Sequence, residues 1–125
     1  MVNDPKPTVS FQYRSKQVWF KAPSEKQKFM ADVAKEYITH YGSKYYGQPE
    51  PVGLSINIYD RKVDKSVYEL NDKYSFRSTD IILIADLVFE ALENVAYDTK
   101  RQVAEIFINK LTNPYQKVEF EVYKL

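Results

Sequence analysis

The segment that constrains the fold most runs from residue 81 to residue 92 and reads Ile-Ile-Leu-Ile-Ala-Asp-Leu-Val-Phe-Glu-Ala-Leu. Apolar residues cover nearly the whole circumference of the helix that this spacing predicts. A helix of that kind is buried on more than one side, so we expect it to lie between a sheet and a second layer, such as a second subunit. Its polar side chains share one narrow stripe, formed by Asp86, Glu90 and Glu93 or Asn94. Thr79 or Asp80 can cap its first turn.

The length of 125 residues and the ordinary composition, 44% hydrophobic and 28% charged, indicate one globular domain. The chain has no cysteine, which excludes a disulfide scaffold and thiolate metal sites and favours an intracellular setting. The N-terminal Met-Val-Asn-Asp-Pro-Lys-Pro lacks the apolar run of a signal peptide, and the apolar run 81–85 is too short to cross a bilayer. We therefore expect a cytoplasmic protein with no membrane partner.

The first half of the chain predicts two strands, a helix and a third strand. Residues 1–7 are expected to form a loose tail, since they contain two prolines and little to bury. The alternation over 9–13 predicts one strand and residues 18–21 predict another. A helix begins at Pro23-Ser24 and ends before Gly42. Its apolar stripe comprises Phe29, Met30, Val33, Ala34, Tyr37, Ile38 and Tyr41. The alternation over 52–58 then predicts a half-buried strand.

The second half adds the buried helix and two more strands. Residues 61–75 are polar and predict either a short helix or a mobile insertion. Residues 102–111 and 117–124 predict strands, and Asn113-Pro114 indicates a hairpin turn between them. The resulting order, β-β-α-β-(α)-α-β-β, indicates an α/β (α+β) domain over residues 8–125, with a small mixed sheet and two main helices.

The sequence of residues 80–103 is similar to the catalytic segment of RusA-like Holliday-junction resolvases, a family common in phages and prophages. Glu90-Ala91-Leu92 stands where the family has Asp-Ala-Leu, Val95-Ala96-Tyr97 matches the loop that follows, and Gln102-Val103 opens the next strand. Residues 18–24 resemble more loosely the family's entry into its first helix. The resemblance implies the RusA-like fold, a homodimer, and DNA recombination with branched DNA as the substrate.

The chain departs from this family at the acids that the reaction needs. Asp80 falls on the first Asp of the Asp-x-Asp-Asn-x-x-Lys motif, but the other motif positions carry Ile82, Leu83 and Asp86. The later Asp-Asp pair is replaced by Thr99 and Lys100. Mg²⁺ requires several oxygen ligands, which Ile82 and Leu83 cannot supply, and the charge of Lys100 repels the ion. The leading hypothesis is therefore a pseudoenzyme that works by binding and needs no cofactor.

Two alternatives stay open. A divergent Mg²⁺-dependent, structure-selective endodeoxyribonuclease could reuse the acids near the old site, which are Asp80, Asp86, Glu90 and Asp98. The simpler reading of the same residues is a solvated stripe with Asp80 or Thr79 as a helix cap. A module that binds a protein partner and no DNA is the other alternative.

Basic residues interleaved with aromatic residues predict contacts with DNA, whether branched or duplex. Cations can contact phosphates and aromatic rings can stack on bases, although a solvated face over core aromatics has the same composition. The candidates are Arg14, Lys16, Trp19, Lys21, Lys26 and Lys28, with Lys100 and Arg101 beside the old active site. His40, the one histidine of the chain, has neither a second histidine nor a cysteine to share a metal, so we expect a capping or surface role.

Overall fold

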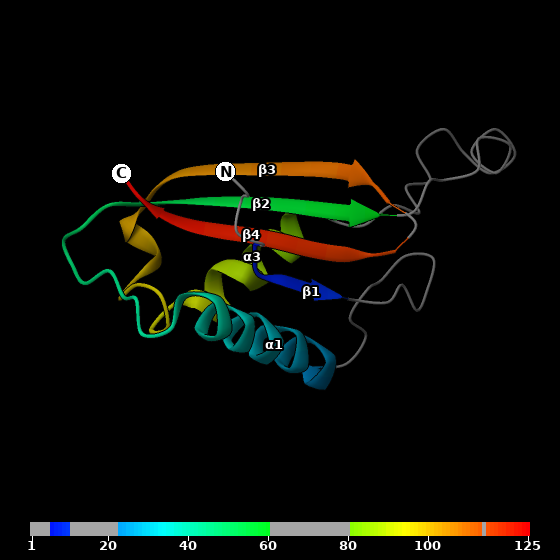
Figure 1. Cartoon of the computed structure of the whole chain (residues 1–125), viewed down its shortest axis with the longest axis horizontal. Coiled ribbons are helices and arrows are strands. Elements are labelled where there is room, and N and C mark those ends of the chain that lie inside the picture. Colours follow the sequence, from blue (N-terminus) through cyan, green and yellow to red (C-terminus); the bar gives the residue numbers. More distant parts are fainter. Residues whose placement is uncertain (1–5, 11–22, 61–80, 114) are drawn as a thin grey trace, which may run out of the picture.

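The computed structural model of the chain describes residues 6–10, 23–60, 81–113 and 115–125. Their elements are β1 (Thr8–Ser10), α1 (Pro23–Tyr41), β2 (Val52–Asp60), α3 (Ile81–Leu92), the 3-10 helix η1 (Lys100–Gln102), β3 (Val103–Thr112) and β4 (Lys117–Lys124). The strands form one four-stranded sheet in the order β1-β4-β2-β3 (Figure 1). The predicted α+β class, with a mixed sheet and two main helices, is confirmed.

β2 lies at the centre of the sheet and determines its topology. It pairs in parallel with β3, from Val52 opposite Val103 to Asp60 opposite Thr112. It pairs antiparallel with β4 on its other side, and β4 in turn pairs with β1. The predicted hairpin between β3 and β4 is therefore wrong, because β2 lies between them (Figure 1). The turn residues correctly indicated a reversal, but a reversal does not require the two strands to be neighbours.

Both long helices lie on one face of this sheet (Figure 1). The alternating residues of β2 and β4 that point to that face are buried: Leu54, Ile56, Ile58, Val118, Phe120 and Val122. Their neighbours in sequence, such as Ser55 and Glu121, are only partly buried on the opposite face. The core is thus a single layer between the sheet and the helix pair, as expected for strands with alternating polarity.

α1 follows the sequence prediction closely, with one exception. Phe29, Val33 and Tyr37 are buried. The helix ends where predicted, since Gly42 has φ +64° and its N–H donates to the carbonyl of Ile38 at 2.8 Å. Ile38, predicted to belong to the buried stripe, is 55% exposed. It lies at the margin of the stripe, where position alone does not decide burial.

α3 is buried on two sides, as its composition predicted: it packs against the sheet and against α1, which lies beside it on the same face of the sheet (Figure 1). Its inner residues are Ile84, Ala85, Leu87, Val88, Ala91 and Leu92. Ile82, Asp86 and Glu90 are exposed. The chain's own core therefore accounts for most of the apolar surface of α3, and a second subunit is not needed to explain it. The helix ends before Asn94, whose φ of 67° is a left-handed conformation that Asn tolerates well.

Several predictions fall outside the described residues. These are the strand over 18–21, the segment 61–75, the cap at Thr79 or Asp80, and the part of the first strand beyond Ser10. At the other end of that strand, the carbonyl of Pro7 accepts a hydrogen bond from the N–H of Phe120 at 3.0 Å, so the described end of the predicted tail is attached to the sheet. Among the described helices, none has the length and apolarity to cross a membrane.

Because α3 is buried on two sides, we expect Ile→Ala substitutions at positions 82 and 84 to lower the free energy of unfolding by very different amounts. Ile84 is fully buried, whereas Ile82 is 67% exposed. We expect Ile84→Ala to lower the free energy of unfolding by about 3 kcal/mol, because it removes buried methylene contacts and leaves a cavity. Ile82→Ala, the matched control, is expected to cost less than about 1 kcal/mol. Urea denaturation followed by circular dichroism measures both, and equal costs would contradict the assigned orientation of α3.

Candidate functional site

The candidate site is the loop between α3 and β3, and the side chain of Gln102 holds it in place. Gln102 is buried. Its Nε2 donates to the carbonyls of Tyr46 at 2.9 Å and Glu50 at 3.0 Å. Its Oε1 accepts from the backbone N–H groups of Asp98 at 2.8 Å and Thr99 at 3.0 Å. Both donors and both acceptor positions of the amide are thus used, and they join the loop before β2 to the loop before β3.

Thr99 is a structural residue at a position where the resemblance led us to expect an acid. It is the N-cap of η1, and its side chain accepts a hydrogen bond from the N–H of Arg101 at 3.3 Å. The return bond comes from its own N–H to Gln102, which completes a capping box. A hydroxyl suits this role, whereas it is a weak replacement for a carboxylate that must hold a metal ion.

Asp98 is held by the tyrosine-rich loop before β2. Its carboxylate accepts hydrogen bonds from the hydroxyl of Tyr45 and from the N–H of Gln48, the latter at 2.8 Å. The Tyr45 hydroxyl and then the Gln48 N–H lower the pKa of Asp98 below its ordinary value, because both stabilise the ionised form. The same bond raises the pKa of Tyr45. Asp98 thus acts as an ionised acceptor that fastens two loops together.

Lys100 places a cation beside the acids at the end of α3. Its Nζ lies 3.7 Å from Oε1 of Glu90, and its backbone N–H donates to Oε2 of Glu93 at 3.0 Å. The Lys100 and Glu90 side chains are both partly exposed, so the pair contributes little to stability. Its effect is local: the carboxylate of Glu90 faces an ammonium group, which competes with any metal ion for that acid.

The structure does not bring together the three candidate acids that it describes. Asp98 is bonded to the loop before β2, Glu90 is paired with Lys100, and Asp86 lies exposed on α3. Asp80 lies outside the described residues. Within the described ranges, no three His, Cys, Asp or Glu side chains are grouped closely enough to hold a metal ion. The described donor set therefore does not fit Mg²⁺.

The predicted DNA-binding residues fall into two separate places. Lys26 and Lys28 lie in the first turns of α1, and Lys28 pairs with Asp32 at 3.0 Å. Lys100 and Arg101 lie in η1, near the left end of the sheet in Figure 1 and away from the first turns of α1. Arg14, Lys16, Trp19 and Lys21 are outside the described residues. Among the described residues the candidates thus form no single basic patch, and η1 is the part that adjoins the candidate site.

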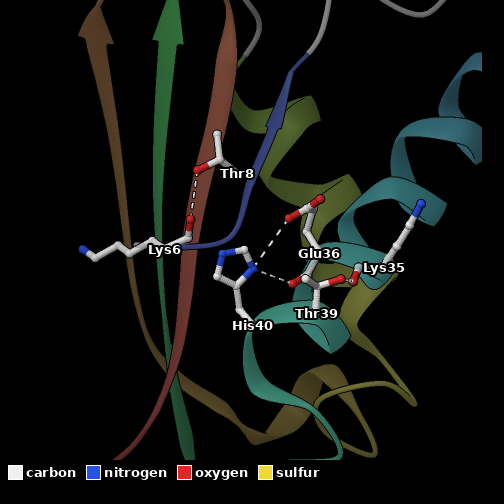
Figure 2. Close-up of polar contacts among 6 residues, drawn as sticks. All are labelled: Lys6, Thr8, Lys35, Glu36, Thr39 and His40. Atoms are coloured by element: carbon white, nitrogen blue, oxygen red, sulfur yellow. Dashed lines mark hydrogen bonds and ion pairs between the residues drawn. The ribbon is translucent and has the colours of Figure 1, made fainter. Parts of the chain in front are cut away.

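His40 lies on the surface near the end of α1, where a surface role was expected. Figure 2 shows its Nδ1 directed at two oxygens of Glu36, the carbonyl at 3.0 Å and the carboxylate at 3.6 Å. Both neighbours are acceptors, so Nδ1 must carry a proton. The adjacent Thr39 similarly donates to the carbonyl of Lys35 at 2.9 Å (Figure 2). Both are i to i−4 bonds within α1, and each adds a side-chain hydrogen bond to a carbonyl of the helix.

Sequence reasoning missed the residues that organise this loop. Tyr45 and Gln48 lie about fifty positions from Asp98 along the chain, and no local pattern links them. It also missed a polar network on the open face of the sheet. There Asn57 connects Asn109 at 3.2 Å to Glu119 at 3.1 Å, and Tyr123 donates to Glu105 at 2.6 Å. The bond to Glu105 raises the pKa of Tyr123 to about 12. The alternation of polar and apolar residues along β2 and β4 was the available signal.

The chain matches no family model, and no curated protein is significantly similar to it in sequence. The likeness to RusA-like resolvases therefore remains a hypothesis that depends on the residues quoted for it.

The four hydrogen bonds of Gln102 predict a severe effect of an isosteric substitution. Gln102→Glu places a carboxylate oxygen against the carbonyls of Tyr46 and Glu50, so at pH 7 we expect a loss of about 3 kcal/mol of unfolding free energy. Part of it should return near pH 4, because a protonated carboxyl can again donate. Urea denaturation at both pH values measures this. Gln27→Glu, at an exposed position of α1, is the control and should change little; an equally small effect at Gln102 would contradict its assigned role.

The lowered pKa of Asp98 predicts a dependence of stability on acid. A carboxyl whose pKa is depressed in the folded state stabilises the fold above its unfolded pKa and ceases to do so as the pH falls through the folded pKa. We therefore expect wild type to be more stable than Asp98→Asn at pH 6, with the difference shrinking below about pH 4. Thermal unfolding from pH 7 to pH 2 measures it. A difference that stays constant over that range would show that ionised Asp98 does not bind Tyr45 and Gln48 as described.

Proposed function

We propose that this chain is a RusA-like protein that binds branched or duplex DNA and has lost nuclease activity. The observation that carries the proposal is the ion pair of Lys100 with Glu90. Lys100 lies in a loop whose sequence resembles the catalytic loop of that family. It occupies the position of the second acid of the family's Asp-Asp pair. The neighbouring acid Asp98 is engaged by Tyr45 and Gln48. The described acids thus serve the loop's structure and are not gathered around a common centre.

The retained architecture around this loop supports the RusA-like part of the proposal. A buried helix is followed by a short loop in which Ala96 and Tyr97 are buried, and then by a strand that begins directly after Gln102. The sequence motif of the family has the same order. Tyr97 donates to the carbonyl of Phe89 at 2.7 Å, so the loop is packed against its own helix. A chain can keep such a scaffold after losing its catalytic acids, because the scaffold depends on burial and backbone hydrogen bonds and the chemistry on a few exposed groups.

The charges of η1 support DNA as the partner. Arg101 is exposed, and among the described residues its guanidinium is in no ion pair. An arginine in this state can contact a phosphate without first giving up a protein partner, and phosphate contacts supply most of the affinity of non-specific DNA binding. The proposal includes a homodimer in the cytoplasm of a host that carries a phage or prophage.

A divergent Mg²⁺-dependent nuclease is the second candidate. Asp86 favours it, since this acid is exposed one helical turn from Glu90. A protein partner in place of DNA is the third reading. The experiments below separate the three.

DNA binding without cleavage is tested on a labelled four-way junction and on a duplex of the same sequence. We expect fluorescence anisotropy to show binding that weakens as salt increases, and gels to show no product with Mg²⁺ or Mn²⁺. Arg101→Glu should reduce the slope of log K against log salt by about 1 or more, because at least one phosphate contact is lost. Lys35→Glu makes the same charge change on an exposed position of α1 and is the control.

Each outcome of this experiment decides between the readings. Metal-dependent cleavage that Asp80→Asn abolishes would overturn the inactive reading in favour of the nuclease. The absence of binding to both DNAs at low salt would overturn the DNA part and leave a protein partner. Equal effects of Arg101→Glu and Lys35→Glu would show that only net charge matters and that η1 is not the contact.

A further inference from the structure

β3 is a long edge strand whose side chains are exposed almost throughout. It spans Val103–Thr112, and in the described part of the chain only β2 pairs with it. Among its residues Phe107 is 53% exposed, Leu111 42% and Ile106 38%. Phe107 and Leu111 face the open side of the sheet and Ile106 faces the helix side, because successive side chains alternate. Apolar surface is therefore presented along both faces of a strand whose outer backbone groups have no partner strand among the described residues.

This edge lacks most of the features that protect natural edge strands. Such edges are usually short, contain proline or several charged residues, or are bent by a bulge. β3 has no proline and pairs regularly with β2 from Glu105 to Thr112, with one irregularity at its start. A long, regular and apolar edge is typical of a surface that another strand covers.

We propose that β3 is covered by β3 of a second copy, the two strands running antiparallel about a two-fold axis at Phe107. This proposal locates the homodimer of the proposed function and rests on that part of it, but not on DNA binding. The axis lies perpendicular to the sheet, so the two four-stranded sheets become one continuous sheet with the helices of both copies on the same face. Such a two-fold interface is isologous, and each residue pair occurs twice.

On the open face this register places compatible side chains opposite each other. Phe107 lies opposite its own counterpart, and aromatic pairs across two strands are favourable. Glu105 lies opposite Asn109, whose amide can donate to its carboxylate.

On the helix face the same register places Ile106 opposite Ile108. No two like charges oppose each other along residues 103–111 of the two copies. Moving the axis to Ile106 or Ile108 instead puts Phe107 opposite Glu105 or Asn109. Moving it to Asn109 leaves residues 103 to 105 unpaired. Phe107 is thus the centre at which the opposing side chains are compatible.

The mass of the protein in solution tests the interface. We expect sedimentation equilibrium at micromolar concentration to give a dimer for the wild type. Phe107→Glu should raise the dissociation constant at least about tenfold, because two carboxylates then face each other across the axis. Phe107 is exposed, so the variant should fold, which circular dichroism checks. Ile38→Glu changes another exposed apolar residue, on α1, and should leave the mass unchanged.

Single cysteines determine the register without depending on a weakened dimer, since the chain has no cysteine of its own. Directly opposite Cβ atoms are about 5 Å apart, close to disulfide distance. Phe107→Cys should therefore form a disulfide-linked dimer under mild oxidation. Leu111→Cys is the control within the same strand, because in this register it lies about 27 Å from its counterpart.

These measurements separate a failure of the proposed DNA-binding function from a failure of the β3 interface. A monomeric wild type would overturn both the homodimer and this interface, while the DNA assays could still succeed. A dimer that Phe107→Glu does not weaken and that Phe107→Cys does not cross-link would overturn this interface alone. Efficient cross-linking of Leu111→Cys without that of Phe107→Cys would overturn the proposed register.

Discussion

The side chain of Gln102 is the contact on which the candidate site depends most. It joins the carbonyls of Tyr46 and Glu50, which precede β2, to the N–H groups of Asp98 and Thr99, which precede β3. β2 and β3 begin their parallel pairing immediately afterwards, with Val52 opposite Val103. Four hydrogen bonds in a buried setting hold both loops, because leaving any of these groups unpaired away from water is costly. The amide therefore aligns the two strands as well as shaping the loop.

The loop that Gln102 supports uses its polar residues for its own structure. Thr99 caps η1, Asp98 binds Tyr45 and Gln48, and the backbone of Lys100 binds Glu93. Each of these roles is satisfied by groups of the protein itself. A fold and the chemistry of a site place different demands on polar groups. The scaffold requires that buried donors and acceptors be paired, while a reaction requires acids left unpaired and aimed at one point.

One edge of the sheet bears on assembly. β3 is long, pairs regularly with β2 from Glu105 to Thr112, and exposes Ile106, Phe107 and Leu111. The sequence had suggested α3 as the surface for a second subunit because of its all-round apolar composition. The structure uses those residues in the chain's own core, between the sheet and α1. The apolar surface that remains for a partner strand lies instead on β3. The sequence predicted this segment only as a strand, with no role in an interface.

Local patterns in the sequence determined the described elements of this protein. The periodicity of residues 23–41 and 81–92, the alternation over 52–58 and 117–124, and the stop at Gly42 all depend on neighbours within one or two turns. The sequence alone also identified the candidate acids and the cation at Lys100. Tertiary structure decided that β2 separates β3 from β4, that Ile38 is exposed, and that Tyr45 binds Asp98. Those outcomes depend on groups brought together from distant parts of the chain, and the periodicity of a single segment carries no information about its distant partners.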